Sequence, residues 1–532
     1  MLAGPDSEAW ITEDDNELVK LIRTLEVMYP TLRPCTKPTY MKRVLREKWD
    51  SVRGIRTRRV RWTVGGDRIT VPFDVGTNTA ALPTVNALFH ACVSEDALFA
   101  TIDIKDFYLG AFLPSPESIL VYLDHNSPAL LESLGISPCL QHDKKGRPFC
   151  YFNITKTMPG LPQSGFYSQL ELVRLLASNG YVETPTPMLF RHVSLPITFT
   201  LVVDDFAVKY NSPSDLDHLL SCLRTKYELK THRTGPTFTY LGYTIDYDRT
   251  LHQMTLSMPN YIPNLLKKLR PHGVRHAPSP AVYTPPSYGS RSPQISPIDN
   301  SPAATPAQKL DIQMTCGSLL FYARALDCTF LTAVGALSAQ QSSPTLSSVA
   351  AAERLLGYAA AHPSHTAIIR PSTMLLQAAV DASYLSRVNS GSVAGGCFFL
   401  GPIPSASDTD PTAVYTPNVP LHQFSTRIPV VVASAAEAEY AAIFGGMQVA
   451  CDLRTTLASL GYPQPPTPVY VDNLCAIGLA TSTVRPKKSK SIDMRFDWIR
   501  DRVQQSLFTV HKILGTSNLA DFFYQNPPRC PT

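Results

Sequence analysis

The chain has few charged residues, and several patterns that would assign it to a class of protein are absent. Charged side chains make up 17% of its 532 residues and the net charge is only +5, which by itself says little about a nucleic-acid partner. The 11 cysteines include no C-x-x-C pair and no zinc-binding spacing, which favours a reduced, intracellular protein. An apolar run of about 18 residues is absent, which predicts no membrane-spanning helix. The acidic start MLAGPDSEAWITEDDNE lacks the features of a signal peptide.

The chain does contain material for several hydrophobic cores. Apolar residues make up 44% of it, and its length predicts roughly two to four domains. Helical and strand patterns mix from residue 1 to 270. A stretch rich in proline and serine at 271–309 reads as a linker or an exposed loop. Helical patterns cover 310–370, and strands then return in an order that suggests a separate α/β domain over 371–532.

Two adjacent aspartates, Asp204 and Asp205, stand at the tip of an apolar hairpin in TFTLVVDDFAVKY. Aspartate is a common turn residue, so an ordinary hairpin is one interpretation. A metal site is the other, because Asp103 ends a buried strand in FATIDIKDFYLGAF. Three carboxylates at neighbouring strand ends repel one another unless cations neutralise them. Oxygen-only ligation favours Mg²⁺ or Mn²⁺, and a pair of such ions suits phosphoryl transfer.

The order of four segments resembles the reverse transcriptase of copia-type LTR retrotransposons. The four segments are DIKDFYLGAF, GLPQSG, LVVDDF and YLGYTID. In addition, RVRWTVGGDRI (59–69) resembles the basic fingers segment ahead of the palm, and SMPNYIPNLLKKL (257–269) resembles the segment that comes directly after the polymerase core. The resemblance spans nearly the whole chain.

The resemblance implies a multidomain protein of α/β and α+β type. A right-hand polymerase fold of fingers, palm and thumb would occupy 1–270, followed by the linker at 271–309. A helical connection would cover 310–370, and an RNase H-like α/β domain would cover 371–532.

The resemblance also implies a role for each matching residue of the polymerase. Asp103, Asp204 and Asp205 would bind two metal ions. Asp106 and Tyr108 would line the sugar pocket, where the bulk of Tyr108 resembles a steric gate against a ribose 2′-OH.

Further positions would contact the substrates. Gln163 would touch the incoming nucleotide, although a helix-capping loop is its plainer interpretation. Lys230 in YELK would donate a proton to pyrophosphate, and Gly242 in YLGY would belong to the primer grip. Arg61 would hold the triphosphate. Other arginines nearby compete for this role: Arg58, Arg59 and Arg68.

The last domain resembles ribonuclease H through an Asp-Glu-Asp-Asp set. Asp381, Glu439, Asp472 and Asp521 would hold two further metal ions and cleave an RNA phosphodiester. The sequence EYAAI after Glu439 matches the Glu-x-x-Ala helix pattern of the family, so Glu437 is interpreted as solvated surface.

The segment KKSKSIDMRFDWIRD resembles the stretch that precedes the final aspartate. Ser491 stands where the family usually has histidine, which implies an altered substrate contact. Lys487, Lys488 and Lys490 form either a solvated basic loop or a contact to the phosphates of a hybrid, and both interpretations stay open.

The expected function is RNA-directed DNA polymerase with linked RNase H endonuclease activity, serving DNA integration of a transposable element. Its partners would be an RNA template, a DNA primer, the RNA–DNA hybrid and dNTPs, with capsid and integrase of the same element as further candidates. It would work in cytoplasmic virus-like particles or the nucleus. The alternatives are an inactive or domesticated relic that binds nucleic acid, or another palm polymerase or repair nuclease. The absence of protease, zinc-knuckle and integrase patterns suggests a piece of a longer polyprotein.

Overall fold

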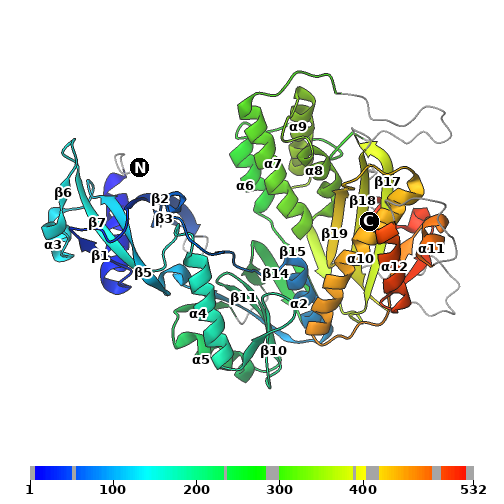
Figure 1. Cartoon of the computed structure of the whole chain (residues 1–532), viewed down its shortest axis with the longest axis horizontal. Helices are drawn as coiled ribbons and strands as arrows, with labels where there is room; N and C mark the ends of the chain where they lie inside the picture. Colours follow the sequence, from blue (N-terminus) through cyan, green and yellow to red (C-terminus); the bar gives the residue numbers. More distant parts are fainter. Residues whose placement is uncertain are drawn as a thin grey trace.

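The computed structural model describes residues 6–50, 55–232, 237–282, 299–387, 391–402, 418–481 and 493–522. These residues form four β-sheets with helices packed against them. Figure 1 shows a blue and cyan N-terminal lobe projecting to one side, a central sheet, and a lobe of late segments on the other side. The mixed α/β, multidomain class expected from the sequence is therefore confirmed. Within the described ranges, no helix combines the length and apolar character needed to cross a membrane.

The N-terminal lobe is built around one sheet. Its elements are α1 (Ser7–Val19), η1 (Lys20–Thr24), β1 (Met28–Thr31), β2 (Thr39–Asp50), β3 (Ile55–Val64), η2 (Gly66–Arg68), β5 (Phe112–Tyr122), α3 (Pro128–Ser133), η4 (Ser137–Cys139), β6 (Gln141–His142) and β7 (Pro148–Lys156). The strands follow the order β1-β7-β5-β2-β3, and β6 pairs with β7.

Strand β3 alternates between core and solvent. Val60, Trp62 and Val64 are buried, whereas Arg59 and Arg61 are exposed, as the period of two in a strand requires. The basic segment 59–69 therefore supplies both a core face and a row of cations.

A buried carboxylate, Asp14, ties α1 to this sheet. It accepts hydrogen bonds from Arg43 Nε (2.9 and 3.0 Å) and from Trp62 Nε1 (2.6 Å). Because the charge of Asp14 is paired with a guanidinium, its complete burial is tolerated.

The central sheet carries the first pair of aspartates. Its elements are α2 (Leu82–Ser94), β4 (Leu98–Ile104), η3 (Phe107–Leu109), α4 (Ser164–Ser178), β8 (Tyr181–Glu183), β9 (Leu189–His192), β10 (Ile197–Val202), β11 (Asp205–Tyr210), α5 (Pro213–Arg224) and β12 (Leu229–His232). The strand order is β12-β4-β11-β10-β9-β8. Figure 1 shows α4 and α5 on one side of this sheet and α2 on the other.

A third sheet joins segments that are far apart in the sequence. Its region comprises β13 (Thr237–Tyr240), β14 (Tyr243–Asp248), β15 (Gln253–Ser257), α6 (Tyr261–Leu269), α7 (Pro306–Ala325), η5 (Cys328–Phe330), α8 (Leu331–Ser338), α9 (Leu346–Ala361) and β16 (Thr366–Ile369). The strand order β13-β14-β15-β16 brings the chain back to β15 after the helices. Helix α7 begins at Pro306, inside the segment expected as a linker, and residues 283–298 of that segment lie outside the described residues.

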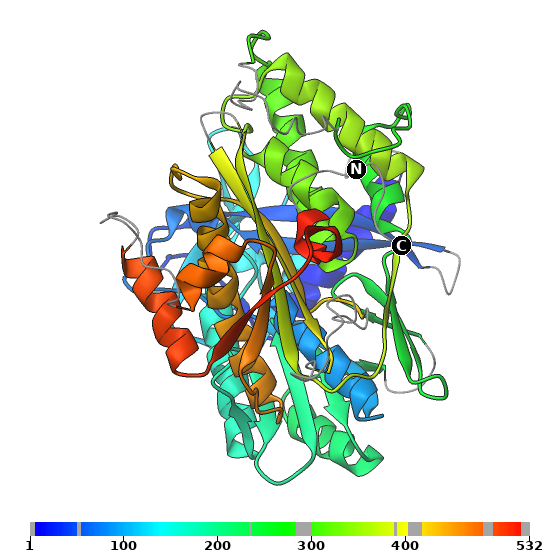
Figure 2. The same cartoon turned by 90° about the vertical axis from the view of Figure 1, so that its right-hand side faces the viewer.

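The last sheet mixes antiparallel and parallel strands. Its elements are β17 (Leu376–Arg387), β18 (Gly391–Leu400), β19 (His422–Arg427), α10 (Ala435–Ser459), β20 (Thr467–Val471), α11 (Leu474–Ala480), α12 (Asp493–Gln504), β21 (Phe508–Lys512), η6 (Gly515–Ser517) and η7 (Leu519–Asp521). The order is β19-β18-β17-β20-β21, in which β20 runs parallel to both of its neighbours. Figure 2 shows the long β17–β18 pair beside α10.

The last fold elements are shorter than the helical pattern of the sequence around Asp521 predicts. Asp521 ends the short 3₁₀ turn η7, with Phe522 helical directly after it, and the strand β21 precedes the turn. The segment Phe508–Lys512 is so short that its residue pattern fits a strand and the end of a helix equally well. Its pairing with β20 is what identifies it as a strand.

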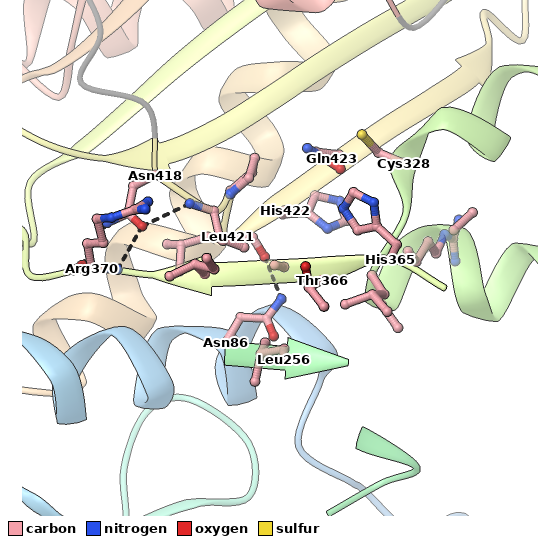
Figure 3. A pocket seen from close by; sticks show the side chains of 18 residues that line it. Asn86, Leu256, Cys328, His365, Thr366, Arg370, Asn418, Leu421, His422 and Gln423 are labelled. Atoms are coloured by element: carbon pink, nitrogen blue, oxygen red, sulfur yellow. Dashed lines mark hydrogen bonds between the residues drawn. The ribbon is translucent and has the colours of Figure 1, made fainter. Parts of the chain in front are cut away.

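The C-terminal lobe docks directly onto α2 of the central region. Asn86 Nδ2 donates to the carbonyl of Leu421 (3.2 Å), and the Tyr462 hydroxyl donates to Glu95. A cavity of about 440 Å³ lies at this junction. Figure 3 shows it between α2 and the strands β16 and β19, with Asn86, Leu421 and His422 at its edge.

His90 makes this junction sensitive to pH. Burial lowers the pKa of His90 from 6.5 to about 4. Between pH 4 and pH 6.5, His90 is therefore protonated in the unfolded chain but neutral in the folded chain. Its contribution to the free energy of unfolding is fully present above pH 6.5 and is lost as the pH falls towards 4. We expect the loss to reach at most about 3 kcal/mol. Thermal unfolding of the wild type and of His90→Gln across this pH range measures it, and equal slopes for the two proteins would exclude His90 as the cause.

Candidate functional site

The first three carboxylates meet at one end of the central sheet. Strands β4 and β11 are antiparallel neighbours, and their register sets Asp103 opposite Asp205. Asp204 lies in the tight turn of the β10–β11 hairpin, directly after Val203, whose φ is +62°. The structure thus brings Asp103, Asp204 and Asp205 together across two strands and one turn.

The proximity of the acids changes the titration of Asp204 and Asp205. Burial, followed by the charges of Asp204 and Asp103, raises the pKa of Asp205 to about 6. Burial and the charge of Asp103 also raise the pKa of Asp204. Each additional negative charge is therefore unfavourable here, and a bound cation would relieve the repulsion.

Three of the expected substrate residues surround the same aspartates. The positive charge of Arg61 lowers the pKa of Asp204, although burial outweighs it. Burial and the charge of Asp204 raise the pKa of Tyr108. Lys230, on β12, is exposed and lies opposite Asp103 in the strand register. The aspartates thus have a cation on β3, a cation on β12 and a phenol nearby.

Two of the competing arginines are engaged elsewhere. Arg58 forms an ion pair with Asp6 (3.1 Å) and lies over the ring of Trp10. Arg68 lies over the ring of Tyr40, 4.8 Å from its centroid. These contacts favour Arg61 as the arginine that faces Asp204.

The remaining predicted positions are held by other contacts or lie in another sheet. Asp106 accepts a hydrogen bond from Lys20 Nζ (3.1 Å). Gln163 is buried and occupies the N-cap position of α4, but its side chain makes no capping hydrogen bond; its Nε2 lies 3.4 Å from Glu117 Oε1. Gly242, with a φ of +87°, forms the β13–β14 turn in a different sheet.

A close approach of two backbones joins β3 to the loop that precedes Gln163. Val64 N donates to the carbonyl of Pro159 (2.8 Å). Gly160 has a φ of +97°, and a Cβ there would lie 2.1 Å from the carbonyl oxygen of Val64. Only glycine fits, so this contact positions β3, and with it Arg61, against the central region.

Gly160→Ala should therefore be strongly destabilising. We expect it to lower the free energy of unfolding by about 3 kcal/mol, because strained backbone and a backbone clash combine. Gly146→Ala is the matched control, since Gly146 also has a positive φ, +76°, but open space around it. Its cost should be only about 1 kcal/mol. Thermal unfolding compares the two, and equal losses would contradict the close approach.

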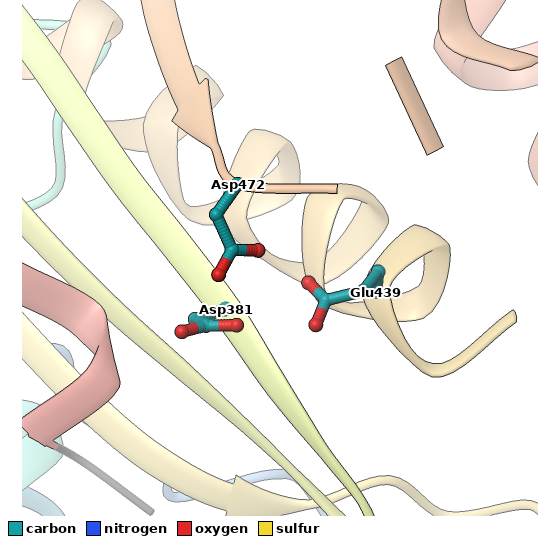
Figure 4. Close-up of side chains that lie close together, drawn as sticks. All are labelled: Asp381, Glu439 and Asp472. Carbon is teal, nitrogen blue, oxygen red and sulfur yellow. The ribbon is translucent and has the colours of Figure 1, made fainter. Parts of the chain in front are cut away.

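A second carboxylate cluster lies on the last sheet. Asp381, Glu439 and Asp472 each place an oxygen within 4.8 Å of the others (Figure 4). Ala379 pairs with Tyr470 in the parallel register, so two residues later Asp381 and Asp472 lie side by side. Among the described residues this trio alone meets that spacing, so Asp103, Asp204 and Asp205 are more widely spaced.

The second cluster is the more deeply buried of the two. Asp381 and Glu439 are 1% and 7% exposed. Burial, then the charges of Asp381 and Asp472, raise the pKa of Glu439 far above its usual value. Within the described chain, Glu439 Oε2 is buried without a hydrogen-bond partner. Such a carboxylate is unfavourable unless it is protonated or bound to a cation, so the donor set fits a divalent, oxygen-seeking metal ion.

The structure distinguishes the two glutamates of α10. Glu437 N donates to the N-cap residue Ser434 (3.2 Å), and Glu437 Oε2 accepts from Ala433 N (2.7 Å). The first bond caps the helix, and the second ties its first turn to the residue before the N-cap. Glu437 is therefore a capping residue rather than simply solvated surface, while Glu439 faces Asp381.

The fourth expected acid is near the same sheet but outside the close trio. Asp521 lies in η7, which packs against β17 and β18, and the preceding Asn518 donates from Nδ2 to the carbonyl of Val380 (3.2 Å). Ser491, Lys487, Lys488 and Lys490 lie outside the described residues.

One neighbour of the second cluster was missed from the sequence. Lys512 pairs with Val471 at the end of β21, and its charge lowers the pKa of Asp472, against the stronger raising effect of burial. Recognising FTVHK as a strand would have identified it.

Comparison with known proteins identifies relatives for most of the chain. It is 27% identical over 385 residues to the retrovirus-related Pol polyprotein from transposon RE1 of Arabidopsis thaliana, covering 71% of this chain and 24% of that protein. It is 23% identical over 392 residues to the corresponding polyprotein from transposon TNT 1-94 of Nicotiana tabacum, covering 72% and 28%. The homologues are thus retrovirus-related Pol polyproteins of plant transposons, which confirms the predicted resemblance. The chain spans about a quarter of their length.

Other comparisons add little. No family model matches the chain. The crystal structure of prototype foamy virus protease-reverse transcriptase aligns with 96% of this chain and 53% of its own, at 13% identity and a TM-score of 0.27. A TM-score this low carries no argument about fold or chemistry.

Proposed function

We propose that the chain is an RNA-directed DNA polymerase with a linked RNase H, the C-terminal part of a copia-type retrotransposon polyprotein. Residues 1–270 would form fingers, palm and thumb, 310–370 the connection and 371–532 the RNase H-like domain. One observation carries the proposal. A single chain bears two separate carboxylate clusters, on two different sheets, at the motifs that resemble these two enzymes.

In the polymerase site, the acids Asp103, Asp204 and Asp205 would hold Mg²⁺ or Mn²⁺. A pair of such ions supplies charge that clamps the attacking and leaving oxygens of phosphoryl transfer. Arg61, close enough to affect Asp204, would bind the triphosphate. Tyr108 would contact the sugar, and Lys230 would hold a proton near the leaving pyrophosphate.

Other residues would support or complete this site. Asp106 is anchored by Lys20, so it would support the turn that carries Tyr108. Gln163 would contact the nucleotide from the start of α4, and Gly242 would shape the hairpin that meets the primer.

In the RNase H site, Asp381, Glu439 and Asp472 would hold the same kind of ion, with Asp521 as the fourth ligand. Because the carboxylates of the cluster are buried and repel one another, a bound cation would stabilise them. The RNA strand would be selected through the backbone and 2′-OH groups of the A-like hybrid, because such a helix is read by shape.

Cleavage of a labelled RNA strand annealed to DNA tests this proposal. With Mg²⁺ present, the wild type should shorten the RNA in the hybrid but leave the same RNA free in solution intact. Asp472→Asn should be inactive. A folded wild type that leaves the hybrid intact would instead favour an inactive relic that only binds nucleic acid.

A further inference from the structure

A cavity of about 270 Å³ lies between α8 of the connection and the strands of the last sheet. Helix α8 contributes one wall, and β17, β18 and β19 contribute the other. The described polar side chains that line it, together called the Arg387 pocket, are Thr332, Gln340, Ser386, Arg387, Ser425, Thr426 and Arg427.

The pocket is positive and lacks an acid. Among the described residues that line it, none is an aspartate or a glutamate. In the described part of the chain, no carboxylate forms an ion pair with the guanidinium of Arg387 or Arg427. Arg387 is nevertheless largely withdrawn from water, and this burial lowers its pKa. A buried cation without a counter-charge is unfavourable, so the pocket is suited to an anion.

The strand register relates the pocket to the second carboxylate cluster. Asp381 on β17 pairs with Gly395 on β18, which in turn pairs with Ser425 on β19. In the same way, Ser383 pairs with Val393, and Val393 pairs with Arg427. Paired residues in antiparallel strands point to the same face, and so do residues two apart. Asp381, Ser425 and Arg427 therefore share one face of the sheet. Strand spacing puts the Cα atoms of Asp381 and Arg427 about 12 Å apart.

We propose that the Arg387 pocket binds a backbone phosphate of the RNA–DNA hybrid and thereby holds the duplex against the cluster at Asp381. This proposal rests on the proposed RNase H function. A guanidinium matches a phosphate with two parallel hydrogen bonds, and hydroxyl and amide groups such as those of Thr426 and Gln340 also bind phosphate oxygens. The contact carries no base specificity, so it would act equally on every sequence.

Binding of a fluorescent hybrid to the full-length chain tests the proposal without any catalysis. Anisotropy is measured in EDTA at several salt concentrations. Arg387→Gln and Arg427→Gln should each weaken binding about tenfold and lower the salt slope by about one. Arg387→Lys should keep the slope, because it keeps the charge. Arg224→Gln, which removes an exposed arginine at the end of α5, should change neither value.

The outcomes separate this proposal from the function on which it rests. If the wild type cleaves hybrid RNA while Arg387→Gln and Arg427→Gln bind it like the wild type, the pocket proposal is overturned and the function stands. Inorganic phosphate is titrated in a separate thermal-shift arm. If it stabilises the wild type but not Arg387→Gln, while hybrid binding is the same in both, the pocket serves free phosphate and the backbone assignment fails. A wild type that neither binds nor cleaves hybrid overturns both.

Discussion

An Asp204→Asn protein is expected to lose primer extension and to keep cleaving RNA in a hybrid. Asparagine preserves the size of the side chain and the turn between β10 and β11, but it cannot supply the negative charge that holds a cation opposite Asp103 and Asp205. We expect extension to fall at least about a hundredfold. Hybrid cleavage should be unchanged, because the second cluster lies on a different sheet.

The control for this substitution is Asp124→Asn. Asp124 is exposed in the N-terminal lobe, so its change removes one charge without touching either cluster. Thermal unfolding should also show that Asp204→Asn is no less stable than the wild type, because one source of the repulsion that raises the pKa of Asp205 is gone. Equal loss of extension in both variants would contradict the assignment.

A Glu439→Gln protein should show the opposite pattern, with hybrid cleavage lost and primer extension retained. The substitution keeps the shape of a buried side chain and removes a carboxyl group whose pKa is raised by burial and by two neighbouring aspartates. Because that repulsion disappears, the melting temperature measured in EDTA should not fall and is expected to rise. We expect cleavage to drop at least about a hundredfold.

Glu437→Gln provides the matched control on the same helix. It weakens the hydrogen bond to Ala433 N and thus the N-cap of α10, so it should cost about 1 kcal/mol of stability. Its cleavage rate should stay near that of the wild type. If Glu437→Gln abolished cleavage and Glu439→Gln did not, the sequence-based choice between the two glutamates would be wrong.

Local patterns were enough to predict the elements that carry the carboxylates. Asp103 and Asp205 flank strands with strong apolar character, so their pairing in neighbouring strands could be expected. The match of EYAAI to the Glu-x-x-Ala helix pattern likewise predicted a helix at Glu439, and α10 starts at Ala435, which puts both glutamates in its first turns.

Tertiary relationships were beyond the reach of the sequence. The hydrogen bond of Asn86 to Leu421 joins residues 335 positions apart, and no local pattern predicts such docking. Lys512 was missed because β21 is short and is stabilised by its pairing with β20. The Arg387 pocket needs α8 and three strands together, so no local pattern of the sequence indicates it.

One assay tests the central claim, that a single chain carries two independent phosphoryl-transfer sites. A labelled RNA template annealed to a differently labelled DNA primer is incubated with dNTPs and Mg²⁺, and both strands are followed in the same reaction. The wild type should lengthen the DNA and shorten the RNA, Asp204→Asn should only shorten the RNA, and Glu439→Gln should only lengthen the DNA. A well-folded wild type that does neither, or variants that lose both activities together, would contradict the account.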